Sequence, residues 1–313
     1  MIPRLFLALF ATLVVGVLSL FAVPGLAEDH DGFILWQLRV PRLLVGLLVG
    51  GSLGLVGAAF QSLFQNDLAT PSTVGTTAGA TLGALLSLVL GLGGGVSGLP
   101  VTVLFAFAGA MAASLLVASV ALEGKARVGD VLLAGIAVTL AAAAVSQMIQ
   151  SLADMRALFS AVQWSLGQLP QLGFDGVKLL TPFCVVSALV VLSQTRSLQS
   201  LALGDEVAHS QGVAVGRVRA LVLAGGSLGV AACVAWCGPI AFVGLIVPHL
   251  VRRSFGAAVR IVLPLSMVLG GGFLVVCDLV GRVAWPGNEL PVGVLTASLG
   301  APALFLLITK GRR

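Results

Sequence analysis

The chain has 313 residues, of which 58% are hydrophobic and 9% are charged, and its formal net charge is +5. Soluble proteins carry about 25% charged residues, so this composition excludes an ordinary soluble domain and predicts an all-α polytopic membrane protein. In such a protein a positive charge is typical of loops on the cytoplasmic side, and it does not indicate nucleic-acid binding.

The apolar runs predict one transmembrane domain that occupies residues 1–313. A spanning helix needs about 20 apolar residues, so a chain of this length accommodates roughly ten of them. We expect these helices over residues 4–23, 41–64, 70–90, 99–121, 128–150, 177–195, 216–236, 240–256, 260–282 and 292–309. The first run precedes Gly25-Leu26-Ala27, as in a signal peptide, but it is long enough to span the membrane and we interpret it as a retained helix.

The basic residues test the orientation of these spans. If the N-terminus lies inside and the sides alternate, the inside holds Arg4, Lys125, Arg127, Arg196, Arg217, Arg219, Arg252, Arg253, Arg260, Lys310, Arg312 and Arg313. The outside then holds Arg39, Arg42, Arg156, Lys178 and Arg282. Cytoplasmic loops are enriched in Lys and Arg, so twelve against five predicts a bacterial cytoplasmic (inner) membrane protein with both termini in the cytoplasm.

Three of the outer arginines lie at helix ends. Arg39 and Arg42 bracket Pro41 at the start of the second span, and Arg282 ends the ninth. Arginines at such positions can anchor a chain at lipid headgroups. They can also bind carboxylates on a partner that arrives from outside, because the planar guanidinium fork binds a carboxylate in two places. On the residues alone both interpretations stay open.

The pentapeptide Gly-Gly-Ser-Leu-Gly occurs at residues 50–54 and again at 225–229. The copies are five spans apart and therefore cross the membrane in opposite directions, so we expect an inverted five-helix repeat. The same residues match the G-x-S-x-G nucleophile elbow, which would make Ser52 or Ser227 with His249 an intramembrane protease site. That motif needs a strand–turn–helix setting, whereas both copies lie inside apolar helical runs.

The longest cytoplasmic connection, residues 196–219, predicts two short amphipathic pieces around Gly204. Asp205 and Glu206 fall at the start of the second piece, where acidic side chains favour the helix dipole. Short amphipathic helices of this kind can bind in a groove of a partner protein. The alternative interpretation is that they pack against the bundle of this chain. The chain has no G-x-x-x-x-G-K-[ST] loop, so any ATP that drives it is hydrolysed by another polypeptide.

Residues 234–250 are almost wholly apolar, yet an unbroken helix describes them poorly. The residues that would interrupt or end a helix there are Gly238, Pro239, Gly244, Pro248 and His249. Interrupted helices survive in lipid only where other protein or a water-lined cavity satisfies the freed backbone groups. We therefore expect a broken helix inside the bundle, next to a gate or a pathway.

The four cysteines lie in apolar runs, at positions 184, 233, 237 and 277. No second Cys or His pair completes a metal site with Cys233 and Cys237. We expect buried free thiols, and we expect this chain to bind neither a metal nor a cofactor.

Several longer motifs follow one another between about residues 36 and 309. They are Arg39-Val-Pro-Arg42; Gln61 to Pro71 with Gly75 and Gly79-Ala80; Leu201-Ala-Leu-Gly-Asp205 with Ala208 and Gly212; Gly238 to His249 with Arg252; Asp278 with Arg282; and Leu290-Pro-Val-Gly-Val-Leu-Thr-Ala with Gly300-Ala-Pro. With this set of motifs the chain resembles the FecCD-type permease subunits of bacterial ATP-binding-cassette (ABC) importers, which carry iron chelates (siderophores, haem) or cobalamin.

The resemblance implies ten helices per subunit, in the fold of the cobalamin-importer permeases, and two permease subunits on a cytoplasmic ABC ATPase dimer that binds ATP-Mg. We expect the permease pair to be two copies of this chain, surrounded by membrane lipid. A periplasmic or lipid-anchored binding protein would deliver the substrate. The chain itself would be no enzyme, and it would move a ferric siderophore or haem inward by alternating access, with cobalamin as the alternative cargo.

The resemblance also implies roles for particular residues. Docking of the binding protein would involve Arg39, Arg42 and Arg282. Coupling to the ATPase would use residues 197–214, and within them Leu201, Leu203, Gly204, Asp205, Glu206, Ala208 and Gly212. The translocation pathway would include Gln61, Thr139, Ser146, Gln147 and Gln150.

The chain departs from the family pattern at two of these segments. Asp67 stands where the family usually has proline, and we expect only a local change because Asp is also a good helix cap. Gln211 replaces a usual leucine in the coupling segment, which bears on the fit to one particular ATPase.

A gradient-driven secondary transporter is the main interpretation from another class. Such proteins usually carry ionisable groups within the membrane. In our assignment only Asp278 falls clearly inside a span, and Arg282 follows it by one helical turn. We therefore expect a structural ion pair between these two residues rather than a proton relay.

Overall fold

The computed structural model describes residues 2–21, 32–92, 95–96, 99–122, 127–284 and 289–310. Four segments or residues used above, Gly25-Leu26-Ala27, Lys125, Arg312 and Arg313, lie outside the described residues. Within the described ranges the chain is helical, apart from turns and a short hairpin in which β1 (Gly95–Val96) pairs antiparallel with β2 (Leu99–Pro100).

Ten helices overlap the ten expected spans, although the span expected at 70–90 begins with a 3-10 helix and its α-helix starts only at Thr76. They are α1 (Ile2–Phe21), α2 (Val40–Leu63), α3 (Thr76–Val89), α4 (Val101–Leu122), α5 (Val128–Leu152), α7 (Asp175–Ser193), α10 (Val215–Cys237), α11 (Val243–Phe255), α12 (Val259–Val283) and α13 (Val292–Lys310). By length and composition, six can cross a membrane: α2 with the turn before it, α4, α5, α7, α10 and α12. Shorter apolar stretches occur in α1, α3 and α13. The expected all-helical fold of a multi-pass membrane protein is confirmed.

Shorter helical pieces connect or extend these helices. A π-helix, η2 (Ile34–Arg39), runs directly into α2, and a 3-10 helix, η3 (Pro71–Val74), precedes α3. The others are α6 (Met155–Ser165), α8 (Thr195–Leu201) and α9 (Asp205–Ser210). The sequence did not predict α6, whose N-terminus is capped by the Asp154 side chain accepting from the Ala157 N–H.

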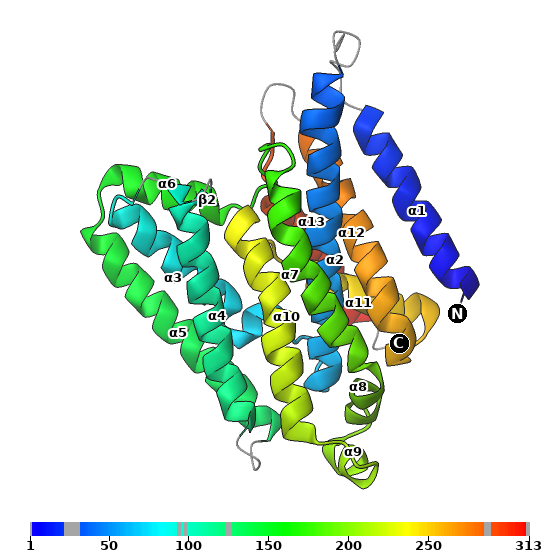
Figure 1. Cartoon of the computed structure of the whole chain (residues 1–313). Coiled ribbons are helices and arrows are strands. Elements are labelled where there is room, and N and C mark those ends of the chain that lie inside the picture. Colours follow the sequence, from blue (N-terminus) through cyan, green and yellow to red (C-terminus); the bar gives the residue numbers. More distant parts are fainter. Residues whose placement is uncertain are drawn as a thin grey trace.

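The centre of the bundle is α2, which packs against α7, α10, α11 and α12 (Figure 1). Its glycines allow this approach: a Cβ at Gly50 or Gly54 would collide with the backbone of α12, and one at Gly57 with the carbonyl of Gly244 on α11. Small residues let helix backbones touch in a membrane protein. The first Gly-Gly-Ser-Leu-Gly copy therefore packs helices, and both copies lie within helices, not in the strand–turn–helix of a nucleophile elbow.

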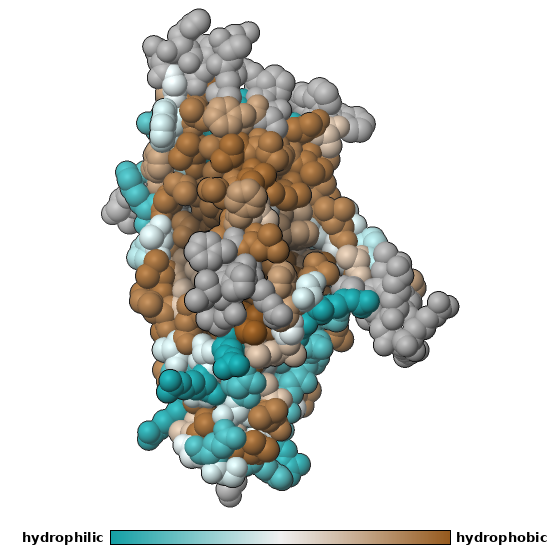
Figure 2. Space-filling view, turned by 90° about the vertical axis from the view of Figure 1, so that its right-hand side faces the viewer, coloured by the Kyte–Doolittle hydropathy of each residue, from teal (hydrophilic) through white to brown (hydrophobic). Residues whose placement is uncertain are grey.

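The remaining helices lie on two sides of this centre. In Figure 1, α3, α4 and α5 stand on one side of α10, while α1 stands at the opposite edge, where it packs mainly on α12. The short helices α8 and α9 project from the lower end of the bundle. Figure 2 shows a broad apolar surface over the middle of the molecule and hydrophilic side chains gathered toward that lower end. This distribution is that of a membrane-embedded bundle whose lower end is polar.

Candidate functional site

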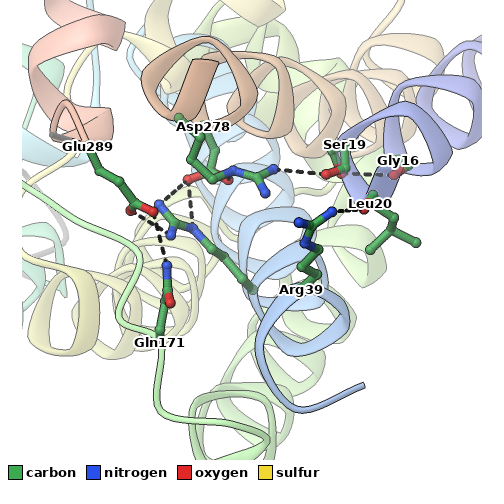
Figure 3. A network of polar contacts seen from close by, with 9 residues as sticks. Gly16, Ser19, Leu20, Arg39, Gln171, Asp278 and Glu289 are labelled. Atoms are coloured by element: carbon green, nitrogen blue, oxygen red, sulfur yellow. Dashed lines mark hydrogen bonds and ion pairs between the residues drawn. The ribbon is translucent and has the colours of Figure 1, made fainter. Parts of the chain in front are cut away.

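A cluster of charged side chains lies where α2, α12 and the segment before α13 meet (Figure 3). Arg42 donates from Nε to Asp278 Oδ1 at 3.0 Å, and its Nη2 lies 2.8 Å from the same oxygen. Its Nη1 donates to Glu289 Oε2 at 2.7 Å. One turn after Asp278, Arg282 places its Nε 3.0 Å from Asp278 Oδ2. Asp278 thus bridges two arginines, and the expected pair of Asp278 with Arg282 is confirmed.

Burial divides this cluster into an inner and an outer part. The side chains of Arg42 and Arg282 are each 8% exposed and that of Asp278 is 6% exposed. A buried charge is stable only when it is paired and hydrogen-bonded, so these three groups form one mutually dependent unit. Glu289 is different: its side chain is 52% exposed, and its second oxygen accepts from Gln171 Nε2 at 3.2 Å.

The same cluster holds the C-terminal end of α1. Arg39 Nη1 donates to the Leu20 carbonyl at 2.6 Å, and Arg282 Nη2 donates to the Ser19 carbonyl at 3.2 Å. The last carbonyls of a helix lack intrahelical donors and carry partial negative charge, so cations are favourable there. The π-helix η2 runs directly into α2, so Arg39 and Arg42, which are three residues apart, lie near each other on the helix surface. From there Arg39 reaches α1.

The structure therefore brings the three predicted docking arginines into one cluster. All three contact groups of this chain. Arg39 and Arg42 are buried, and Arg282 is half-buried as a residue with a side chain that is only 8% exposed, which the sequence did not predict. Their role in docking a partner stays a prediction. Sequence reasoning also missed Glu289, whose only signal was a carboxylate in a loop on the same side as three arginines.

At the other end of the bundle, α8 and α9 form the predicted pair of short amphipathic helices. Leu198, Leu201 and Ala208 are fully buried against the bundle, whereas Leu203 is 64% exposed. Gly204 joins the two helices with φ 120° and ψ 153°, a conformation that is essentially limited to glycine. The segment thus packs on its own bundle through one face and leaves Leu203 at the surface.

Asp205 anchors this segment to α10. Arg219, only 2% exposed, donates from Nη2 to both carboxylate oxygens of Asp205 at 2.7 and 2.6 Å. Charge-assisted contacts of this kind are among the strongest hydrogen bonds in proteins. Of the other predicted coupling residues, Glu206 is exposed and Gly212 forms the turn after α9 with φ 76°. The unusual Gln211 accepts from the Ser200 hydroxyl and so links the end of α9 to α8.

Gln61, a predicted pathway residue, lies in the core at the end of α2 and is 2% exposed. Its Nε2 donates to the carbonyls of Gly244 and Leu245 on α11, both at 3.3 Å. Its Oε1 accepts from Arg252, which also lies 3.2 Å from Asp67 Oδ1. Asp67, the departure noted above, is therefore an ion-pair partner of α11. A cavity of about 560 Å³ opens beside these side chains, next to α8.

Three of the four predicted pathway residues of α5, namely Thr139, Ser146 and Gln150, lie on one face of the helix by their spacing, and Gln147 lies beside that face. Ser146 is buried and Thr139 is half-buried, with its hydroxyl donating to the Gly135 carbonyl at 2.8 Å. Gln147 and Gln150 are exposed, and Gln150 lines a cavity of about 240 Å³ together with α3 and α6. Their pathway role stays a prediction.

The expected break in residues 234–250 occurs between α10 and α11. Gly238, with φ 73°, ends α10, and Phe242, with φ 67°, precedes α11 in a left-handed conformation that is rare for a bulky residue. The Cys237 carbonyl accepts from the Gln168 N–H at 2.7 Å, so the loop after α6 satisfies the interrupted backbone. A cavity of about 200 Å³ lies between this break, α2 and η3.

Three of the predicted helix-breaking residues lie inside α11. They are Gly244, Pro248 and His249, so α11 continues through Pro248 to Phe255. Proline removes the N–H that would bond to the carbonyl four residues earlier, which is Gly244. Gln61 donates to that carbonyl, and this tertiary hydrogen bond is the physical reason that the helix continues.

The four cysteines are buried and form no disulfide, as expected. Cys184 on α7 and Cys233 on α10 have their Sγ atoms 3.8 Å apart. In the part of the chain that the structure describes, no group of three or more His, Cys, Asp or Glu side chains is placed to hold a metal ion.

Comparison with known proteins gives consistent matches over nearly the whole chain. A model of the FecCD transport family matches residues 4–310. The chain is 38% identical to the cobalamin import system permease protein BtuC of Halobacterium salinarum, over 93% of this chain and 76% of that protein. It is 37% identical to the Fe(3+) dicitrate transport system permease protein FecD of Escherichia coli, over 91% of this chain and 88% of that protein. A solved inward-facing structure of a metal-chelate type ABC transporter superimposes with a TM-score of 0.88 and 27% identity, covering 99% of this chain and 100% of that one.

Proposed function

Because the chain belongs to the FecCD transport family, we propose that it is the permease subunit of an ABC importer that moves a ferric siderophore or haem inward across the bacterial cytoplasmic membrane. The observation that carries this proposal is the family match over residues 4–310, together with relatives that are import permeases for chelated iron and cobalamin. ATP hydrolysis then belongs to a separate ATPase dimer, which binds ATP-Mg.

In this proposal the chain crosses the membrane ten times. Six described helices are long and apolar enough to span, three contain shorter apolar stretches, and α11 follows the break after α10. The two Gly-Gly-Ser-Leu-Gly copies, in α2 and α10, support an inverted repeat of five helices. The basic residues around α8, α9 and the start of α12 favour a cytoplasmic position for that end and for both termini.

The two ends of the bundle would serve two partners. A periplasmic or lipid-anchored binding protein would dock at the arginine cluster of Arg39, Arg42 and Arg282, whose guanidinium groups suit carboxylates. The ATPase would receive residues 197–214, in which Leu203 is exposed and Asp205 is anchored to α10. Closure of the ATPase would move α8 and α9, and α10 and α12 would follow because Arg219 and Gln199 connect them to this segment.

Cobalamin is the alternative cargo. The relatives include a cobalamin permease and an iron-dicitrate permease at nearly equal identity, 38% and 37%. We favour chelated iron as the commoner cargo of this family. Competition between radiolabelled ferric siderophore, haem and cobalamin in the same uptake assay separates these substrates.

A gradient-driven transporter is disfavoured by the state of Asp278. Its carboxylate lies between Arg42 and Arg282, which is the arrangement of a structural ion pair.

The deciding experiment is purification of the tagged chain from its native membrane in mild detergent, followed by mass spectrometry of what accompanies it. We expect a stoichiometric ATPase, a binding protein and either one permease sequence, for a homodimer, or two. Reconstituted liposomes should then take up the chelate only with internal ATP-Mg. Recovery of this chain alone after crosslinking, with uptake that follows an ion gradient, would contradict the importer proposal.

A further inference from the structure

The arginine cluster contains one carboxylate that is free to leave it. Asp278 bridges two buried arginines, so its departure would leave both without their shared anion. Glu289 contacts only Arg42 among the arginines of the cluster, through the 2.7 Å bond from Nη1, and its side chain is 52% exposed. It also lies outside any helix, in the short segment before α13. When Glu289 turns toward solvent, Arg42 still keeps Asp278.

The charge balance gives this motion a consequence. Among the described residues, the ion pairs of the cluster join two arginines (42 and 282) and two carboxylates (278 and 289), so the formal charges of these four groups sum to 2 − 2 = 0. Without Glu289 the sum becomes 2 − 1 = +1, and Arg42 Nη1 loses the acceptor that Glu289 provides. A carboxylate that arrives from outside can then take the place of Glu289, because a guanidinium group that already binds one carboxylate can donate to a second one through its remaining N–H groups.

We propose that Glu289 is an internal stand-in for an acidic side chain of the binding protein, and that the binding protein must displace it from Arg42 in order to dock. This inference rests on the proposed importer function. Glu289 and the partner's carboxylate compete for the same Nη1, so Glu289 weakens docking and speeds release after delivery. Gln171, which donates to Glu289 Oε1 at 3.2 Å, holds the stand-in over Arg42.

The test uses the full importer complex in lipid nanodiscs and the binding protein that copurifies with it, labelled with a fluorophore. Glu289→Gln keeps the size of the side chain but removes its charge. A partly exposed ion pair of this kind contributes modestly, so we expect Glu289→Gln to lower the Kd for the binding protein about two- to fivefold. Gln171→Ala, which only loosens the stand-in, should lower the Kd by a smaller factor.

Asp175→Asn is the matched control. Asp175 starts α7 near the same end of the bundle, its side chain is 71% exposed, and its nearest cation is Lys178 at 3.9 Å. Both variants remove one negative charge from this end, so general attraction of an acidic partner changes both equally. Relief of the competition at Arg42, in contrast, would change the Kd for the binding protein only in Glu289→Gln.

Three outcomes decide the question. A lower Kd in Glu289→Gln and an unchanged Kd in Asp175→Asn support the stand-in. An unchanged or higher Kd in Glu289→Gln, with ATP-driven uptake intact, overturns it and leaves the importer function standing. If the unaltered complex neither binds the copurified protein nor shows ATP-driven uptake, the proposed function fails and the stand-in fails with it.

Discussion

Gln61 on α2 donates a hydrogen bond to the carbonyl that Pro248 leaves without its helical donor on α11. In an α-helix the N–H of residue 248 would bond to the carbonyl of residue 244, but proline has no N–H. The Nε2 of Gln61 lies 3.3 Å from the Gly244 oxygen and takes that place. The other end of the same amide accepts from Arg252, one turn after Pro248. One buried side chain thus completes α11 and fixes it against α2.

Replacing Gln61 by leucine should destabilise the protein. The substitution leaves the buried Gly244 carbonyl without its donor and removes one of the two partners of Arg252, which keeps Asp67. An unsatisfied buried group costs about 1–3 kcal/mol. Thermal unfolding of the purified protein in detergent measures the effect, which we expect as a clear fall in Tm.

Two further variants make this prediction specific. Gln163→Leu, at an exposed position on α6, is the matched control and should leave Tm nearly unchanged. Pro248→Ala restores the helical N–H, so the double variant with Gln61→Leu should lose less stability than the sum of the single changes. Strict additivity of the two changes would contradict the compensation between Gln61 and Pro248.

Gly204→Trp should abolish uptake and separate it from ATP hydrolysis. A Cβ at Gly204 meets nothing within 4 Å, so the new side chain begins in open space, but φ 120° is strained for any other residue. The bulky ring would also occupy the surface offered to the ATPase. Uptake and ATPase activity in proteoliposomes measure both effects, with Gly129→Trp as a control in similarly open space on α5. Normal uptake by Gly204→Trp would remove the coupling role from this segment.

Asp205→Asn should detach the coupling segment from α10. Arg219 is 2% exposed and donates to both oxygens of Asp205, so loss of the carboxylate leaves a buried cation with a weakened partner. Breaking such a pair costs about 3–5 kcal/mol when both groups are buried, and we expect less here because Asp205 is 34% exposed. Limited proteolysis near residue 204 and ATPase stimulation report the change. The neighbouring exposed acid, altered as Glu206→Gln, should behave like the unaltered protein.

The span positions followed from apolar runs of membrane length, because that signal depends on neighbouring residues alone. The break at Gly238 was equally visible, since glycine and proline act locally on the backbone. The continuation of α11 through Pro248 was not visible, because its cause is Gln61, 183 residues from the carbonyl that it bonds. Likewise α6 is an 11-residue amphipathic helix, too short and polar to register as a span.

In the candidate site, too, some features follow from neighbouring residues and others depend on contacts between distant segments. The arginines 39, 42 and 282 could be identified from their position at helix ends and from the resemblance. Their burial, and their contacts with Glu289 and with the carbonyls at the end of α1, depend on how α1 and α12 pack on α2. No local pattern encodes that packing.

Arg42→Leu should lower stability as well as docking. The change leaves Asp278, which is 6% exposed, with Arg282 as its remaining ionic partner and releases Glu289, and removal of one member of a buried ion pair costs about 3–5 kcal/mol. Arg156→Leu on α6, at an exposed position, is the control and should change neither Tm nor the affinity for the binding protein. An unchanged Tm in Arg42→Leu would mean that the cluster does not hold α2 and α12 together.

Replacement of Arg39, Arg42 and Arg282 by glutamate should weaken docking of the binding protein further. That loss of affinity indicates direct contact only in variants whose Tm matches the unaltered protein, because a disordered cluster would lose the partner too. An unchanged affinity in the glutamate variants would make the arginines membrane anchors.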